Sequence, residues 1–513
     1  MKFLTGAILR LPEYRVVSDA VASNRLPACA TGLSGIHKAH VISALCEEHH
    51  KKALVIAGDE AEATRLEQDL KALGLSTAFY PYRDFGFRNV ESSSREYEQQ
   101  RLGVLAQILT DHCDVVLCCA DGALQYTMPP NELRRRIATL HTGDKVSPAV
   151  LTGLLTAAGY ERVAQVESIG QYALRGGILD LCVPGDTQPV RIEFWGDEID
   201  TISEFELESQ RRGEVLESVT VSPSTEVPVG DPEGLAEEIE AFANSLRSKT
   251  VQKAREILQL EADRLRTTKT LGSVDKFYSL IFPTKACLLD YVREDRMIFL
   301  SEYVKVRDRY RSVSWQNGED IKEFLEDGVL CRGLDEFSMD WPHLLGVLED
   351  KPTVYLENFA HGNFETPIRA LTNFTARQLS VWSGDMQLLR EDLDNILGRQ
   401  WACAVLAGTE KAARSLADDL REQNYPAEYA ENPESLLPGK VLVLPGGFSS
   451  GMEYPGCTFS VITHGIPAQK RKNRRKIKQG QDIQSLSELK FGDFVVHSIH
   501  GIGVFEGIHK IEL

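Results

Sequence analysis

The chain has 513 residues, a length that predicts about three to four domains, and 42% of its residues are hydrophobic. The formal net charge of -18 argues against a surface that binds nucleic acid over most of its extent. No apolar run reaches membrane-spanning length, and we expect a cytoplasmic protein with no membrane partner. The 10 cysteines form no Cys-x-x-Cys pair, which indicates small buried thiols in a reducing compartment and no metal site.

A degenerate phosphate loop is predicted near the N-terminus, where residues 27–58 have the order strand, glycine loop, helix, strand. Gly32 and Lys38 keep the register of G-x-x-x-x-G-K-(S/T), but His37 replaces the second glycine and Ala39 replaces the hydroxyl that would bind Mg²⁺. The degenerate loop comprises Gly32, Gly35, His37, Lys38 and Ala39. We therefore expect no bound cofactor, no ATP hydrolysis and no catalytic residue in this loop.

The remainder of residues 1–136 is expected to form the first part of an α/β domain. The continuous apolar run at 114–120 predicts a buried strand of a parallel sheet. Aromatic residues at 80–87 are expected to pack in its core. The fold class predicted here is α/β, with a RecA-like parallel sheet of the P-loop NTPase type.

A small antiparallel sheet is predicted within residues 168–212. Strand-like runs at 178–183 and 190–195 are separated by Gly-Gly and Pro-Gly-Asp turns, beside which stand Arg175, Arg191 and Trp195. Planar guanidinium groups near a large aromatic ring are favoured at protein-docking faces. A β-rich domain whose arginines are merely solvated is the open alternative.

This tract resembles a domain shared by the excision helicase UvrB and the transcription-repair coupling factor family. The resemblance implies that residues 137–224 dock on the damage sensor UvrA through Arg175, Arg191 and Trp195, although the family usually has Phe at the last position. The decayed phosphate loop is similar to that of the coupling factor, whereas UvrB keeps its loop intact.

The chain is expected to return to the first domain over residues 225–350. A long amphipathic helix is predicted at 232–266, followed by a strand at 296–301 and a charged helix. The docking domain would then be an insertion in the first domain, as it is in the resembled family.

Residues 351–465 are predicted to form a second α/β domain that acts as a structural spacer. Strands are expected at 401–408 and 458–465, a strand and a loop at 440–455, and an amphipathic helix at 409–425.

A basic linker is predicted at 466–485. Its positive charges are Lys470, Arg471, Lys472, Arg474, Arg475, Lys476 and Lys478. A solvated linker is favoured over a specific contact with DNA.

Residues 486–513 resemble the start of the polymerase-interacting domain of the coupling factor, a small Tudor-like β-barrel. The resemblance implies contact with the β subunit of bacterial RNA polymerase, for which Ile511 is a candidate through strand addition. The barrel does not finish before Leu513, so we expect an N-terminal portion of the family architecture. In the family, ATP and Mg²⁺ belong to a motor that translocates on double-stranded DNA.

The resemblance implies a binding module for transcription-coupled nucleotide-excision repair, which recruits UvrA to stalled RNA polymerase. Two alternatives stay open: an ATP-dependent DNA helicase similar to UvrB, and a general DNA-binding protein.

Overall fold

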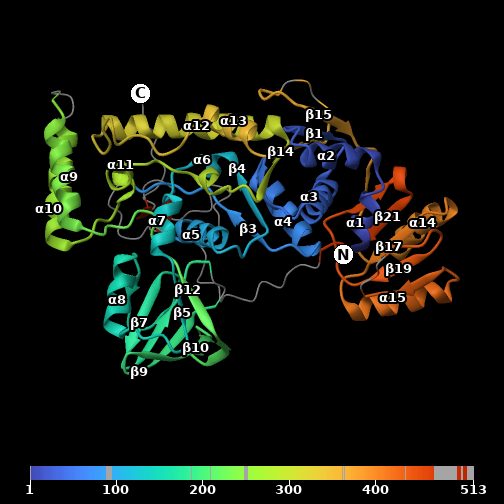
Figure 1. Cartoon of the computed structure of the whole chain (residues 1–513), viewed down its shortest axis with the longest axis horizontal. Coiled ribbons are helices and arrows are strands. Elements are labelled where there is room, and N and C mark those ends of the chain that lie inside the picture. The colour runs from blue at the N-terminus through green and yellow to red at the C-terminus, as the bar shows by residue number, and fades with distance from the viewer. Residues whose placement is uncertain are drawn as a thin grey trace.

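The largest sheet of the protein has seven strands, all parallel, in the order β15-β1-β14-β13-β2-β4-β3 (Figure 1). Its strands are β1 (Ala28–Thr31), β2 (Lys52–Ala57), β3 (Thr77–Tyr80), β4 (Val115–Cys119), β13 (Arg296–Ser301), β14 (Thr353–Leu356) and β15 (Ala370–Asn373). The structure is a computed structural model that describes residues 2–87, 95–185, 188–207, 209–247, 252–360, 362, 364–431, 433, 435–466, 494–497 and 501–504.

Both faces of this sheet are buried, because successive residues of a strand face two different cores. In β2, Val55 packs in one core, whereas Leu54 and Ile56 pack in the other. The helices on the first face are α1 (Lys2–Ile8), α2 (Pro12–Ala22), α3 (Gly35–His49) and α4 (Glu60–Ala72). Those on the second are α5 (Glu96–Leu109), α6 (Ala120–Leu124), α7 (Pro130–Arg136), α12 (Tyr303–Glu326) and α13 (Trp341–Asp350).

Several predictions for this part of the chain are confirmed. The order predicted over residues 27–58 is that of β1, α3 and β2, and the apolar run at 114–120 contains the buried strand β4. Tyr80 is fully buried, and Phe85 and Phe87 both pack against Phe337, so the aromatic residues at 80–87 do enter the core. All 10 cysteines are buried free thiols.

The seven-stranded sheet extends further along the sequence than expected. Strand β13 lies between β2 and β14, as the predicted return of the chain requires. However, β14 and β15 also join this sheet, although residues 351–465 were assigned to the second α/β domain. Both strands pair with β1. They are short, and their sequences do not indicate whether they join the seven-stranded sheet or the sheet of the second α/β domain.

A second sheet of six strands, the inserted sheet, has the order β11-β10-β9-β8-β7-β6 and is antiparallel except between β6 and β7. Its strands are β6 (Glu161–Arg162), β7 (Gln171–Arg175), β8 (Ile178–Leu181), β9 (Val190–Trp195), β10 (Glu198–Phe205) and β11 (Arg212–Leu216). Helix α8 (Pro148–Ala157) covers its inner face with Leu151 and Leu155. Strand β5 (Ala138–His141) pairs with β12 (Ser218–Val221), so the chain enters and leaves this region at one place.

The single long helix predicted at 232–266 is wrong. Two helices, α9 (Pro232–Ser245) and α10 (Gln252–Thr268), pack against each other (Figure 1). Their apolar stripes meet in one core that includes Leu235, Ile239 and Leu258. The spacing of apolar residues is the same in one helix or two, but only the hairpin lets each stripe bury the other.

The third sheet, the second α/β unit, has the order β16-β20-β21-β17-β19-β18. Its strands are β16 (Arg377–Leu379), β17 (Ala402–Leu406), β18 (Ala427–Tyr429), β19 (Val441–Leu444), β20 (Gly451–Tyr454) and β21 (Phe459–Thr463). Helices α14 (Met386–Gly398) and α15 (Glu410–Glu422) pack on one face. The strand and loop predicted at 440–455 contain two strands, since β20 is an antiparallel neighbour of β21.

The other face of this third sheet shares a core with the first unit. Phe448, Met452 and Phe459 pack in the same cluster as residues of α1 and α3. His40 Nδ1 lies 3.1 Å from the Tyr454 hydroxyl, and the His37 ring stands edge-on to Tyr454 at 5.0 Å between centroids. These α/β units are therefore joined by a continuous apolar layer.

Buried titratable groups lie in this shared layer. Burial lowers the pKa of His37 to about 3 and the pKa of His40 to about 4. Asp69 accepts hydrogen bonds from the Ser449 amide at 2.7 Å and from its hydroxyl at 2.6 Å. Burial raises the pKa of Asp69 to about 6.

Near the end of the chain, β22 (Phe494–His497) and β23 (Gly501–Val504) form an antiparallel pair. The predicted Tudor-like barrel is not confirmed by this pair. The basic run at 470–478 and Ile511 lie outside the described residues. In the part of the chain that the structure describes, no helix has both the length and the apolarity needed to cross a bilayer.

We expect acid to weaken the shared layer through its histidines. The pKa values of His37 and His40 in the folded state lie below the ordinary 6.5. Above pH 6.5 both histidines are therefore neutral in the folded and in the unfolded chain, and they do not make stability depend on pH. Below that pH the unfolded chain takes up protons that the folded chain does not, and stability falls by about 1.4 kcal/mol per pH unit per histidine.

Urea unfolding at pH 7.5, 6.0 and 5.0 measures this slope in the parent and in His40→Gln. In the variant, the dependence of the free energy of unfolding on pH should be smaller by about 1.4 kcal/mol per pH unit, which corresponds to one proton. Asp69 acts in the opposite direction because its folded-state pKa is raised, but it is present in both proteins and cancels in the comparison. An equal pH dependence in the parent and in His40→Gln would contradict the lowered pKa of His40 in the folded protein.

Candidate functional site

The outer face of the inserted sheet carries the three residues predicted to dock a partner. Along β9, Val190, Ile192 and Phe194 pack toward the inner core. The alternate residues of the strand, which include Arg191 and Trp195, therefore belong to the opposite, outer face.

A buried carboxylate orders the two arginines on this face. Asp180 of β8 is fully buried and lies directly across from Arg191. Arg191 donates from Nε to Asp180 Oδ1 at 2.6 Å and from Nη2 to Oδ2 at 3.0 Å, a bidentate pair. Arg175 donates to the same carboxylate from the neighbouring strand.

Arg191 is held further by groups on β10 and beyond. Its Nη1 donates to the Gln210 carbonyl at 3.2 Å, and its guanidinium lies 4.8 Å from the centroid of Phe205. Hydrogen bonding to Asp180 raises the pKa of the Arg191 guanidinium. The side chain is only 15% exposed. The alternative of merely solvated arginines is therefore wrong for Arg191, whereas Arg175 is half exposed.

Trp195 is the most exposed large apolar residue on this surface. It ends β9 at the tight turn to β10, where it pairs with Glu198 across the hairpin, and 84% of it is exposed. Gly196 takes a positive φ of 65°, which suits glycine and lets the chain reverse directly after the tryptophan. Ile178 and Val215 are also exposed on this sheet.

Sequence reasoning missed Asp180, which organises the pair. The available signal was one acidic residue inside the otherwise apolar strand ILDL of β8. A buried carboxylate needs cationic partners, and Arg175 and Arg191 were the nearest candidates in the sequence.

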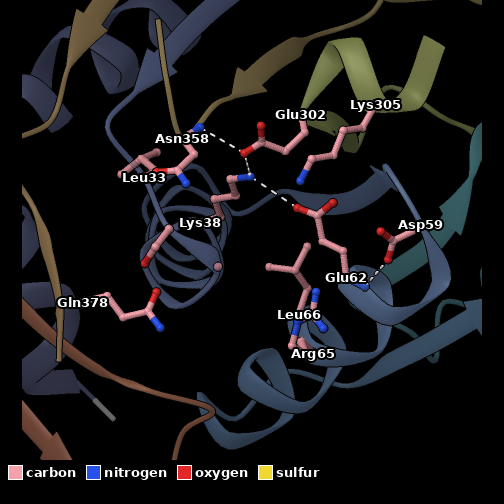
Figure 2. A pocket seen from close by; sticks show the side chains of 12 residues that line it. Leu33, Lys38, Asp59, Glu62, Arg65, Leu66, Glu302, Lys305, Asn358 and Gln378 are labelled. Atoms are coloured by element: carbon pink, nitrogen blue, oxygen red, sulfur yellow. Dashed lines mark hydrogen bonds and ion pairs between the residues drawn. The ribbon is translucent and has the colours of Figure 1, made fainter. Parts of the chain in front are cut away.

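The degenerate phosphate loop forms the second candidate site, and its lysine is already paired (Figure 2). Lys38 Nζ lies 2.5 Å from Glu302 Oε1 and 3.3 Å from Glu62 Oε1, and it donates to the Ser301 hydroxyl at 2.9 Å. The side chain is 3% exposed. Neither glutamate could be identified as a partner from the sequence, because they lie 24 and 264 positions away.

The other loop residues also take structural places. Gly32 has a φ of +79°, and a Cβ there would meet the Phe374 carbonyl. Gly35 is the first residue of α3, whose N-terminal Ser34 hydroxyl lies 2.7 Å from His37 Nδ1. Ala39 is fully buried. Of the five predicted loop residues, only Gly35 and Lys38 line the pocket beside this loop.

A pocket of about 190 Å³ adjoins Lys38, and Figure 2 shows its lining. Three cationic and three acidic side chains line it, namely Lys38, Arg65, Lys305, Asp59, Glu62 and Glu302. Their formal charges cancel. A triphosphate would meet two carboxylates on the lysine that should neutralise it, so the arrangement disfavours phosphate binding.

Comparison with known proteins finds two domain models that match parts of this chain. The model of the UvrB interaction domain matches residues 138–227, and that of the CarD-like/TRCF RID domain matches residues 489–513. The chain is 27% identical over 517 residues to the transcription-repair-coupling factor of Bacillus subtilis (strain 168), and 98% of the chain is covered.

The chain is thus similar over almost its whole length to transcription-repair-coupling factors. Coupling factors from Staphylococcus haemolyticus (strain JCSC1435) and Staphylococcus aureus (strain MRSA252) are 24% and 23% identical to it, each covering 94% of the chain. The chain spans less than half the length of these curated relatives: 44% of the Bacillus factor and 42% of the other two.

We expect Arg191→Ala to lower the free energy of unfolding of the protein by about 3 kcal/mol, because it removes the bidentate partner of a buried carboxylate. Trp195→Ala should stay within about 0.5 kcal/mol of the parent, since the indole is mostly in solvent. Urea unfolding followed by circular dichroism distinguishes the two variants. Equal effects would contradict the structural role of Arg191.

Lys38→Met should destabilise the protein by about 3 kcal/mol, because it removes the buried cation that contacts both Glu62 and Glu302. Adding Glu302→Gln to Lys38→Met should restore part of the loss, and urea unfolding of both variants measures it. A stable Lys38→Met variant that has lost ATP binding would instead indicate a working phosphate site.

Proposed function

We propose that this chain is a binding module of transcription-coupled nucleotide-excision repair, which recruits the damage sensor UvrA through the outer face of the inserted sheet. The observation that carries the proposal is the exposed Trp195 beside an arginine pair fixed by Asp180, within the region that matches the UvrB interaction domain.

The physical argument rests on pre-organisation. Arginine and tryptophan side chains provide much of the binding free energy at protein interfaces. Arg175 and Arg191 are already ordered by Asp180, so binding costs less side-chain entropy than it would for free arginines. The partner surface should offer an apolar pocket for the indole and acceptor oxygens for the half-exposed Arg175.

A second partner surface is proposed for the end of the chain. The match of residues 489–513 to the CarD-like/TRCF RID domain supports contact with the β subunit of RNA polymerase. Among the residues that the structure describes, β22 and β23 pair only with each other, and strand addition by a partner would use an outer edge of this pair. Ile511 and the basic run at 470–478 stay predictions, the latter for a linker that could contact DNA phosphates.

We also infer that the seven-stranded unit is a RecA-like domain that has lost its nucleotide site. The parallel sheet and the order β1, loop, α3, β2 support this. A helicase similar to UvrB would need Lys38 available for phosphate, and the ion pairs of Lys38 argue against that alternative. ATP, Mg²⁺ and translocation on double-stranded DNA are proposed only for the longer family members.

Binding to purified UvrA tests the proposal. Trp195→Ala and Arg175→Ala should each raise the Kd by about 30-fold or more, a loss typical of interface residues of this kind. Arg191 is left intact, because its replacement would confuse loss of binding with loss of folding.

Trp315→Ala is the matched control, since that tryptophan is 68% exposed on α12, outside the inserted sheet. It should leave the Kd unchanged. No binding by the folded parent, or an equal loss in the control, would overturn the proposal.

A further inference from the structure

Three side chains with metal-ligating atoms meet outside both sites described above. They are Cys287, Asp290 and His343, and their ligand atoms all lie within 4.8 Å of one another. Cys287 and Asp290 belong to the 3₁₀ turn η3 (Leu288–Tyr291) and its N-cap, and His343 lies in the first turn of α13.

The local backbone fixes the positions from which these side chains project. Cys287 is the N-cap of η3, and its amide donates to Asp290 Oδ2 at 2.7 Å. The Asp290 amide in turn donates to the cysteine sulfur, so a reciprocal capping box places the thiol and carboxylate on one side of the turn. The His343 amide donates to Asp340 Oδ1 at 3.0 Å, which anchors the start of α13.

We propose that Cys287, Asp290 and His343 bind a divalent zinc ion. Thiolate and imidazole are ligands that Zn²⁺ prefers, whereas Mg²⁺ and Ca²⁺ require oxygen ligands almost alone. Three protein ligands leave a fourth tetrahedral position for water. The exposed Asp290 and the half-buried His343 give the ion a route to the buried sulfur.

The geometry needs only a small adjustment to close on a metal. Zinc bonds of about 2.0–2.3 Å at tetrahedral angles put ligand atoms roughly 3.5 Å apart. Side-chain rotation of His343 and Asp290 therefore has to bring the atoms together by about 1 Å. As the Zn–S bond forms, the thiol proton leaves to solvent, and no electron is transferred.

The bound ion would join two connections of the seven-stranded sheet. Turn η3 precedes β13 and helix α13 precedes β14, and these strands are neighbours in the sheet. A metal bound by residues of η3 and α13 would crosslink the segments that lead into β13 and β14. The expected role is structural and independent of the docking function proposed above.

Cobalt substitution tests this site on the untagged full chain. Adding Co²⁺ should produce one equivalent of bound metal with the near-ultraviolet charge-transfer absorption of a cobalt–thiolate bond. Zn²⁺ should displace it, and at about a hundredfold excess over its Kd should raise the Tm by about 2.5 °C.

His343→Ala and Asp290→Asn should weaken Co²⁺ binding at least tenfold, and Cys287→Ser should abolish the charge-transfer band. Cys331→Ser is the matched control, because Cys331 is equally a buried free thiol but packs in the core of the helical hairpin. Should Cys287→Ser fail to fold, His343→Ala decides, since this half-buried side chain can be removed without opening the core. No band in the parent, or an unchanged band in His343→Ala, would overturn the proposal.

Discussion

Glu226 lies at the point where the chain leaves the inserted sheet, and it is 1% exposed. Its carboxylate accepts from Arg83 Nε at 2.9 Å and from Arg101 Nε at 2.7 Å. Arg83 reaches on to Asp275, so four distant segments of chain meet at one buried cluster of charge. Buried charges are tolerated only when their partners satisfy them, and any tilt of the inserted sheet would break several of these bonds at once. The position of the proposed docking face relative to the α/β core depends on this cluster.

The same device recurs at the two sites. Asp180 fixes Arg191 and leaves Arg175 half exposed, which keeps one guanidinium available to a partner. Around Lys38 the ratio of charges is reversed, because two carboxylates pair with a single cation. The pocket beside Lys38 has no net positive charge. A lysine that would neutralise phosphate in an active loop here stabilises the junction of α3, α4 and α12. One type of interaction therefore presents a binding face in one place and closes a nucleotide site in another.

Local patterns predicted the elements better than their assembly. The glycine loop, the buried strand β4 and the hairpins of the inserted sheet each have a signal within about ten residues, and all of them are found. The helical hairpin was missed because apolar spacing does not say whether a helix turns back on itself. Sheet membership of β14 and the pairing of Lys38 with Glu302 depend on contacts between residues far apart in sequence. The role of Asp180 could be predicted only in part. A single acidic residue in an apolar strand indicates that a cation must pair with it, but it does not identify that cation.

The apolar layer that α1 and α3 share with Phe448, Met452 and Phe459 has a mechanical consequence. Neither α/β unit can swing away from the other without exposing a core that both need, so the connection between β15 and β16 does not act as a hinge. The two units should unfold as one cooperative block, and a protease cut in that connection would leave the halves associated. Force applied to the second α/β unit would reach the seven-stranded sheet directly, through side-chain packing rather than through the linking peptide.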